Sequence, residues 1–271
     1  MIESRYASCM WSYRHEHFTV HQLPALRDNF IYLIEAYASD ALVAVDPAEA
    51  VSVRRACKLL GKPLTHIINT HHHWDHTDGN TELKKNFNCR IFAYQQDASR
   101  IPGIDIKVSA ATPPVIDGLH ISVVEVPGHT SGHIAYVIDD ALFCGDTLFG
   151  AGCGRLFEGT PAQMWQSLNK LAALPAQTKV YCAHEYTLPN LAFARVVDPD
   201  NSELDQRVVT DRQKREADEP TIPSTIGMEK ATNPFLRPMN QRFCEAYAGE
   251  RGIAHDALTV FTDIRLKKDH F

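Results

Sequence analysis

The chain has 271 residues, 44% of them hydrophobic, and a formal net charge of −6. This length and composition suit one large domain or two smaller ones with a sizeable core, and they argue against a disordered chain. The chain contains no run of lysine and arginine of the kind that contacts a nucleic-acid phosphate backbone. It also contains no apolar run that approaches the ~20 residues of a membrane span. We therefore expect neither nucleic acid nor a membrane as a partner.

The first sixteen residues contain no continuous apolar run of the kind that a signal peptide needs. We predict that residues 1–16 form a loose arm before the first strand. The seven cysteines are widely spaced and form no CxxC pair, which is typical of reduced thiols in a cytoplasmic protein. A cytoplasmic location and a monomeric state are the expectations.

From residue 17 onward, apolar runs of strand length alternate with segments of helical spacing. The predicted strands cover residues 18–23, 30–35, 41–46, 65–69, 89–94, 120–126, 134–139, 141–149 and 179–184. The predicted helices cover residues 48–61, 80–87 and 161–174. Gly61 is a plausible end for the first helix, and Thr160-Pro161 a plausible start for the last.

After about Tyr186 the pattern changes to helical or irregular segments, and no strong strand remains. The mixed-charge run Asp211–Glu219 predicts a solvated helix face. The chain is therefore expected to be an α/β protein with three parts: the arm at 1–16, a strand-rich domain at 17–187 and a mostly helical domain at 188–271.

The segment "NTHHHWDHTDGN", Asn69 to Asn80, places four histidines and two aspartates directly after a predicted strand. Residues two apart on an extended segment point the same way, so His71 and His73 can share one metal ion while His72 points elsewhere. Asp75 and His76 lie where the chain turns toward a helix. They can face the same cavity from another side, which suits a second ion.

Three further strands end in residues that bind metals. His129 follows Pro-Gly in an exposed turn, and we prefer it as a ligand to His133, which we expect to make a structural hydrogen bond. Asp146 follows an apolar strand, and its two carboxylate oxygens can bridge two cations. His184 ends another strand. In open α/β sheets, such strand ends are where sites assemble.

Together these segments predict a metal site with seven ligands: His71, His73, Asp75, His76, His129, Asp146 and His184. Nitrogen and carboxylate ligands without cysteine suit zinc best, and they also suit iron or manganese. Seven ligands exceed what one tetrahedral ion uses, whereas two ions ~3.5–4 Å apart with a bridging water can use them all.

Four of the motifs, "THHHWDH", "PGHTSGH", "CGDTLF" and "AHEYT", resemble the metallo-β-lactamase fold. The longer stretch "CGDTLFGAGCGRLFEGTPAQMWQSL", with "HEYT", "NPFLR" and "RLKKDHF", resembles glyoxalase II, hydroxyacylglutathione hydrolase. This resemblance covers the chain from about residue 17 to the end. The resemblance implies an αββα sandwich followed by a smaller helical domain that binds substrate. It also implies a dinuclear thioester hydrolase that converts S-D-lactoylglutathione and water to glutathione and D-lactate, the second step of methylglyoxal detoxification.

The resemblance also implies a role for each site residue. His71, His73 and His129 would hold one ion, Asp75, His76 and His184 the other, and Asp146 would bridge them. We assign catalytic roles to Asp75 and Asp146: the metal-bridging hydroxide is the nucleophile, and Asp75, which could be mistaken for a general base, is interpreted as a ligand that also orients the water. The implied glutathione contacts are Arg155, Phe157, Tyr186, Arg265 and Lys268.

Two of these contacts depart from the common family pattern, because Arg155 stands where lysine is frequent and Phe157 where tyrosine is frequent. Phe157 lacks a hydroxyl, so one hydrogen bond to the substrate is lost. Arg265 and Lys268 are three residues apart, so on a helix they share a face and can grip one carboxylate together. Without the resemblance, a solvated face would be the better interpretation of these two residues.

Two alternative functions fit the metal motif alone. One is a mononuclear iron persulfide dioxygenase of the same fold, and the other is a metal-binding module without catalysis. The turn "GAGCGR", Gly150 to Arg155, is interpreted as a flexible turn that carries Arg155 to the cavity. Cys153 within it has no base at a recognisable spacing, so we predict a structural role for it.

Overall fold

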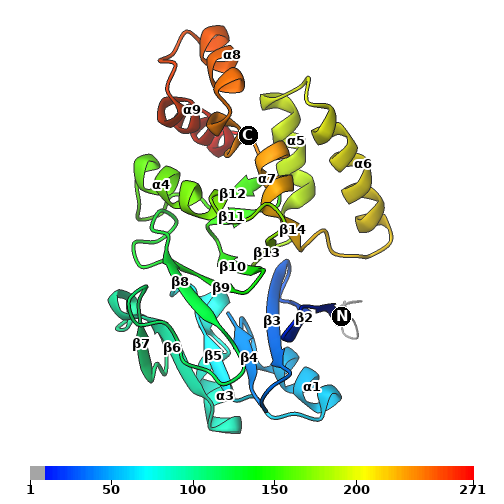
Figure 1. The fold of residues 1–271 in the computed structure, drawn as a ribbon, viewed down its shortest axis with the longest axis vertical. Coiled ribbons are helices and arrows are strands. Elements are labelled where there is room, and N and C mark those ends of the chain that lie inside the picture. The colour runs from blue at the N-terminus through cyan, green and yellow to red at the C-terminus, as the bar shows by residue number, and fades with distance from the viewer. Residues whose placement is uncertain (1–9) are drawn as a thin grey trace. The chain divides into compact units, whose positions relative to one another are not determined.

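The computed structural model describes residues 10–271, and the chain forms two compact units (Figure 1). The first unit comprises the residues up to Glu125 together with Gly132–Gly145. The second comprises Val126–Ser131 together with Asp146–Phe271. Most of the predicted strands lie in the first unit, and most of the helices lie in the second.

A seven-stranded sheet dominates the first unit, with its strands in chain order. Strands β1 to β4 pair antiparallel, and β4 to β7 pair parallel. Their bounds are β1 Trp11–Arg14, β2 Phe18–Ala25, β3 Asn29–Ala36, β4 Leu42–Val45, β5 His66–Ile68, β6 Arg90–Tyr94 and β7 Ile106–Val108. The parallel half brings the carboxyl ends of β4 and β5 to the same edge, where the histidine-rich segment begins.

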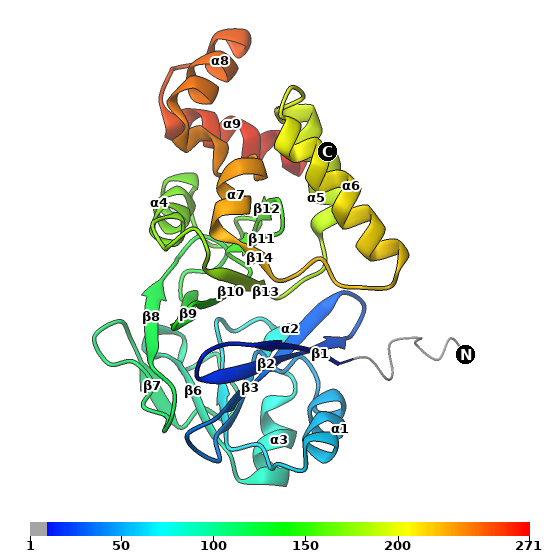
Figure 2. The ribbon, with the colours of Figure 1, turned by 45° about the vertical axis from the view of Figure 1, so that its right-hand side comes forward.

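Two helices cover one face of this sheet, α1 Ala50–Leu60 and α3 Asn80–Phe87, and they lie side by side (Figures 1 and 2). Ile31 and Leu33 of β3 belong to the same buried core as Val53 of α1 and Leu83 of α3. Because side chains alternate along a strand, Tyr32 lies on the opposite face. Gly61 ends α1 in the left-handed conformation, at φ 67°, as its sequence position predicts.

The other strands of the first unit are β8 Ile121–Glu125, β9 Ile134–Ile138 and β10 Ala141–Gly145, which form an antiparallel meander. The ring of Phe143 on β10 lies 5.6 Å from that of Tyr32 on β3. The Tyr136 hydroxyl on β9 donates to the Asn69 carbonyl oxygen at 3.0 Å. The meander therefore packs on the face of the large sheet that α1 and α3 leave open.

The second unit contains the hairpin β11 Leu148–Phe149 and β12 Gly152–Cys153, and the pair β13 Lys179–Cys182 and β14 Ser224–Thr225. Its helices are α4 Pro161–Ala172, α5 Thr187–Val197, α6 Ser202–Glu216, α7 Ile226–Thr232, α8 Gln241–Arg251 and α9 Ala257–Asp269. Thr160 and Gln163 form a capping box at the start of α4, and Pro161 is its first residue. Helices α5 and α6 lie side by side (Figures 1 and 2).

Four short elements complete the list: α2 Trp74–Thr77, the 3-10 helices Gln95–Asp97 and Arg237–Met239, and an isolated bridge between Ile116 and Leu119. Within residues 10–271, no helix is both long and apolar enough to cross a membrane.

The prediction of a loose N-terminal arm was wrong for residues 11–14, which form β1 against β2. Trp11 and Tyr13 are half-buried and alternate with exposed Ser12 and Arg14, a strand pattern that is too short to recognise alone. Residues 1–9 of the predicted arm lie outside the described residues.

The single strand predicted at 141–149 was also wrong, because the chain turns between β10 and β11. Gly145 has φ 48°, and a Cβ there would collide with the Thr70 hydroxyl and the His133 ring. This turn places Asp146 outside the hydrogen-bonded strands.

Two details of the helical part also differ from the predictions. Strand β14 has two residues where no strand was predicted. Asp211, in the run Asp211–Glu219 that was predicted to be a solvated helix face, is buried against Arg207.

Candidate metal centre and substrate groups

The loop from β5 to α2 carries the first group of ligand-type side chains. His71 Nε2 lies 3.1 Å from His73 Nδ1, as expected for residues two apart on an extended segment. His71 Nδ1 lies 3.0 Å from the Thr70 hydroxyl oxygen. His71 is buried. Its Nδ1 faces Thr70, and its Nε2 is the nitrogen beside His73.

Asp46, at the end of β4, orients this group, and sequence reasoning missed its role. Its buried carboxylate accepts hydrogen bonds from the Thr70 amide at 2.7 Å, the Thr70 hydroxyl at 2.6 Å and His76 Nδ1 at 3.0 Å. Since the Thr70 proton goes to Asp46, the Thr70 oxygen accepts from His71 Nδ1–H. Both His71 and His76 then present Nε2 as the basic nitrogen, the arrangement that metal-binding histidines need.

Asp75 and His76 lie on the single turn of α2. The Asn29 side-chain amide donates to the Asp75 carbonyl oxygen at 3.0 Å and to its Oδ2 at 3.2 Å. His76 Nε2 lies 3.7 Å from the same Oδ2. The helical turn therefore brings a carboxylate oxygen and an imidazole nitrogen next to each other, which suits one ion.

Two neighbouring histidines have other surroundings. His72 donates from Nδ1 to Asp97 Oδ2 at 3.1 Å, and Arg100 approaches its Nε2 at 3.3 Å. His133 is buried and stacks on His71, with 4.5 Å between ring centroids. Among residues 10–271, neither histidine belongs to a cluster with metal-binding geometry.

The second group of ligand-type side chains is His129, Asp146 and His184, all of them buried. His129 Nε2 lies 3.4 Å from Asp146 Oδ2, and His184 Nε2 lies 3.4 Å from Asp146 Oδ1. His129 Nδ1 donates to the Arg155 carbonyl oxygen at 2.8 Å, so its Nε2 is the basic nitrogen. One carboxylate thus presents a different oxygen to each histidine, as a bridging ligand does.

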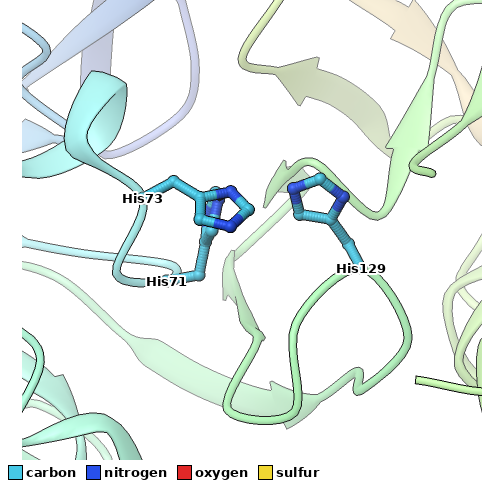
Figure 3. Close-up of side chains that lie close together, drawn as sticks. All are labelled: His71, His73 and His129. Carbon is cyan, nitrogen blue, oxygen red and sulfur yellow. The ribbon is translucent and has the colours of Figure 1, made fainter. Parts of the chain in front are cut away.

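Within residues 10–271, three sets of side chains have ligand atoms within 4.8 Å of one another. They are His71, His73 and His129 (Figure 3); Asp75, His76 and His184; and Asp46, His71 and His76. The first two sets coincide with the ligand sets that the family resemblance implies. Their imidazole and carboxylate donors, without cysteine, fit zinc, iron or manganese. The third set reflects the hydrogen bonds of Asp46.

Three aromatic side chains lie beside these histidines. The ring of Phe157, which is 61% exposed, lies 5.2 Å edge-on from that of His129. Tyr186 stacks on His184 at 4.7 Å, and its ring lies 5.4 Å from Phe149. Phe157 and Tyr186 were predicted to contact the substrate, and both are adjacent to histidines of the second group.

Two of the three predicted cationic contacts, Arg155 and Arg265, lie beside Asp269, and the third, Lys268, lies beside aromatic rings and is affected by the charge of Arg265. Arg265 is buried and donates to the Cys153 carbonyl oxygen at 3.1 Å and to Asp269 Oδ1 at 2.8 Å. Arg155 Nε lies 3.8 Å from the same Oδ1. Lys268 Nζ lies 5.1 Å from the centre of the Phe193 ring, and burial together with the charge of Arg265 lowers the pKa of Lys268.

The segment "GAGCGR" is a buried hairpin and not the flexible turn that we predicted. The residues from Leu148 to Gly154 are buried, whereas Arg155 is exposed. Burial raises the pKa of the Cys153 thiol, which lies 3.6 Å from an Arg265 nitrogen. A buried, protonated thiol is a poor nucleophile, in agreement with the structural role predicted for Cys153.

Comparison with known proteins decides the family. Residues 26–184 match the model of the metallo-β-lactamase superfamily, and residues 185–271 match that of the hydroxyacylglutathione hydrolase C-terminus. A hydroxyacylglutathione hydrolase of Rhodospirillum rubrum is 50% identical over 93% of this chain and 98% of its own length. One from Methylococcus capsulatus is 46% identical over 92% and 97%.

The chain belongs to the hydroxyacylglutathione hydrolase family. Its fold class is as the sequence predicted, a metallo-β-lactamase fold followed by a helical C-terminal domain. Solved structures support the fold. The crystal structure of ETHE1 from Myxococcus xanthus has a TM-score of 0.62 at 21% identity, covering 96% of this chain and 99% of that one. The BLEG-1 B3 metallo-β-lactamase has a TM-score of 0.60 at 22% identity, covering 79% and 98%.

Proposed function

We propose that this protein hydrolyses the thioester bond of S-D-lactoylglutathione and other S-2-hydroxyacylglutathiones. The products are glutathione and a 2-hydroxy acid, D-lactate for the first substrate, which is the second step of methylglyoxal detoxification. The observation that carries the proposal is the match of residues 185–271 to the hydroxyacylglutathione hydrolase C-terminus, together with 50% identity to a hydrolase of that name over nearly the whole chain.

We propose that the chain binds two divalent metal ions, with zinc as the metal in the cell. His71, His73 and His129 would hold one ion, and Asp75, His76 and His184 would hold the other. Asp146 would bridge them, as the 3.4 Å approach of each of its oxygens to a different histidine suggests. When bound, the ions would supply a hydroxide near neutral pH and a counter-charge for the carbonyl oxygen of the thioester.

The protein's own groups would prepare this site before any substrate arrives. Asp46 and the Arg155 carbonyl oxygen fix the ring orientation of His76 and His129, so that each histidine offers Nε2. Asn29 holds Asp75, whose carboxylate would also orient the attacking hydroxide. The leaving group is a thiolate, with a thiol pKa of about 8.5 for an ordinary cysteine, and it needs no strong general acid.

Recognition of glutathione is proposed for Arg155, Arg265 and Lys268, together with Phe157 and Tyr186. Glutathione carries two carboxylates and one ammonium group, so positive charge must offset the net charge of −6 on the protein. Arg155 and Arg265 approach the single carboxylate of Asp269, and Lys268 lies near enough to Arg265 for that charge to lower its pKa, so positive charge is in local excess. Phe157 can contribute only apolar and ring contacts, so this part of the site relies on Tyr186 for a hydroxyl.

The helical C-terminal match favours the hydrolase over a mononuclear iron persulfide dioxygenase or a metal-binding module without catalysis. The hydrolase uses two ligand sets and a glutathione-binding helical domain, whereas the dioxygenase needs only one ion. We further propose the domain limits 17–187 and 188–271, a monomer, and a cytoplasmic location. The six cysteines among residues 10–271 are present as thiols, which suits a reducing compartment.

The test combines metal analysis of the purified protein with two activity assays. We expect two divalent ions per chain and release of free thiol from S-D-lactoylglutathione in water. One iron per chain with oxygen consumption on a glutathione persulfide would instead establish the dioxygenase. Metal binding without either reaction would leave only the binding module.

A further inference from the structure

The hairpin β11–β12 connects two parts of the proposed site. Asp146 comes two residues before β11, and Arg155 comes two residues after β12. The two ends are tied together, since the Gly154 amide donates to the Thr147 carbonyl oxygen at 3.2 Å. The Arg155 carbonyl oxygen accepts from His129 Nδ1 at 2.8 Å. Any shift of the hairpin therefore moves a proposed bridging carboxylate, a histidine ligand and a proposed substrate cation.

Two side chains from the helical region hold the backbone at the tip of this hairpin. The Ala151 amide donates to Glu229 Oε2 at 2.9 Å. The Asn233 side-chain amide donates to the Gly152 carbonyl oxygen at 2.9 Å and to the same Glu229 Oε2 at 3.0 Å. Ala151 has φ 52°, a left-handed conformation that is unusual for a residue with a Cβ and needs such support.

The Glu229 carboxylate is itself fixed from its other side. It is fully buried, and its Oε1 accepts from Arg207 Nη2 at 2.7 Å and from the Ser224 hydroxyl at 2.6 Å. A buried carboxylate is costly unless its charge is paired and its oxygens are hydrogen-bonded, and all of these bonds are present here. Oε1 thus anchors the residue, and Oε2 faces the hairpin.

The glycines of the hairpin allow a further side chain to approach. The Asn190 amide of α5 donates to the Gly150 carbonyl oxygen at 3.1 Å. A Cβ at Gly152 would collide with this amide, and a Cβ at Gly150 would collide with the Thr187 hydroxyl. Gly150 and Gly152 are therefore explained by contacts with α5, and the third glycine of "GAGCGR", Gly154, by the approach of the Asp146 carbonyl oxygen, rather than by flexibility.

We propose that Glu229 and Asn233 are positioning residues for the metal and glutathione sites. By fixing the tip of the hairpin, they set the positions of Asp146 at its start and Arg155 at its end. A metal or binding site works only when packing and supporting hydrogen bonds hold its groups close to the required geometry. The part concerning glutathione rests on the hydrolase function proposed above, whereas the part concerning metal retention rests only on the proposed metal ligands.

Glu229→Gln tests the proposal, because glutamine keeps the size but has one acceptor and one NH2 group. The charge-assisted bonds from Arg207 hold the remaining oxygen, so the NH2 group turns to the hairpin and meets the Ala151 amide donor to donor. We expect metal ions to be lost to a competing chelator at about fivefold lower chelator concentration, and KM for S-D-lactoylglutathione to rise about fivefold, with a smaller change in kcat.

Ser224→Ala is the matched control, since it removes a bond to the same carboxylate on the side away from the hairpin. We expect it to lower the melting temperature while metal retention and KM stay within about twofold of the wild type. Equal changes in both variants, or none in either apart from thermal stability, would show that Glu229 serves stability alone and would overturn the proposal.

Asn233→Ala gives a second test if Glu229→Gln does not fold, because it removes the side-chain hydrogen bonds to the Phe149 and Gly152 carbonyl oxygens of the hairpin and leaves the buried Arg207–Glu229 ion pair in place. Weaker metal retention in the folded variant supports the proposal, and wild-type retention overturns it. The chelator competition uses no substrate. If the wild type binds two ions but hydrolyses no glutathione thioester, the proposed function fails while the positioning role is still tested.

Discussion

Asp146 is the residue on which the two-ion proposal depends most. Each of its oxygens lies 3.4 Å from the Nε2 of a different histidine, His129 on one side and His184 on the other. A terminal ligand would need to face only one of them. Asp146 follows the turn at Gly145 and lies between β10 and β11, outside both strands.

Asp146→Ala should therefore lose both metal ions or hold them weakly, because it removes the ligand that they share. His72→Ala is the control from the same histidine cluster, and its metal content should stay almost unchanged, since His72 bonds to Asp97. Metal analysis after dialysis measures both variants. Two tightly bound ions in Asp146→Ala would show that the carboxylate does not bridge.

Asp46 tests whether an orienting residue matters as much as a ligand. Three donors, from Thr70 and His76, converge on its carboxylate, and asparagine in its place can accept with only one oxygen. Asp46→Asn should weaken retention of the ion at His76 by roughly 10- to 100-fold while the chain stays folded. Chelator competition measures this, and wild-type retention of both ions would contradict the orienting role.

The ligand types were predictable from the sequence, but Asp46 was not. His71 and His73 follow from a local rule, because residues two apart on an extended segment face the same way. The role of Asp46 depends on the parallel pairing of β4 with β5, which places Val45 opposite Ile68 and brings two distant strand ends together. A single sequence does not reveal that pairing.

At the scale of single elements, α9 presents two adjacent lysines in different surroundings. Lys268 Nζ lies 5.1 Å from the centres of the Phe193 and Phe271 rings, beside Arg265. Lys267 Nζ lies 5.7 Å from the centre of the Tyr247 ring. The helix thus separates one lysine proposed to bind glutathione from a matched neighbour.

Lys268→Ala should raise KM for S-D-lactoylglutathione at least tenfold, given roughly 1.5–3 kcal/mol for a charge-assisted hydrogen bond. Lys267→Ala should change it little, and a small neutral thioester should respond to neither variant. Steady-state kinetics with both substrates measures this. Equal effects of the two variants would remove Lys268 from the glutathione site. Single variants are preferable to one that includes Arg265, which also holds the hairpin through the Cys153 carbonyl oxygen.

The pH dependence of KM gives an independent check on the same lysine. Burial and the charge of Arg265 lower the pKa of Lys268, so it loses its proton at a lower pH than an ordinary lysine. As pH rises through that lowered pKa, the positive charge disappears and KM for the anionic substrate should rise. A KM profile with the same alkaline rise in Lys268→Ala would assign the effect to another group.

Elements with strong local signals were predictable, and those that depend on distant contacts were not. The α4 helix follows from Thr160 and Pro161, and α1 ends at Gly61 as expected. The break between β10 and β11 was missed. It depends on Thr70 and His133, which approach Gly145 in the fold but are distant from it in the sequence. A family resemblance supplied the site roles that local pattern leaves open.

For the whole molecule, buried thiols link the packing of both units to alkaline pH. Burial raises the pKa of Cys57 and Cys89 to about 11 and that of Cys182 to about 12. A raised folded-state pKa contributes stability that is complete below the unfolded-state pKa and is lost as pH rises through the folded value. The free energy of unfolding should therefore decline as pH rises from about 8.5, the pKa of an ordinary thiol, to about 12, the pKa of Cys182 in the folded protein.

Iodoacetamide at pH 8 should leave these three cysteines unlabelled in the folded protein and label them in denaturant. Cys182→Ala should flatten the alkaline loss of stability, measured as the free energy of unfolding against pH. Rapid labelling of native Cys182 would mean that the core around β13 opens readily, and it would contradict the burial described here.

A metal titration of the metal-free protein tests the central claim most directly. The rate of S-D-lactoylglutathione hydrolysis is measured as zinc is added in known ratio to the chain. Because both ligand sets and the bridging Asp146 are proposed to act together, we expect the rate to reach its plateau at two zinc ions per chain. A plateau at one ion, or full hydrolysis without metal, would contradict the dinuclear hydrolase proposed for this chain.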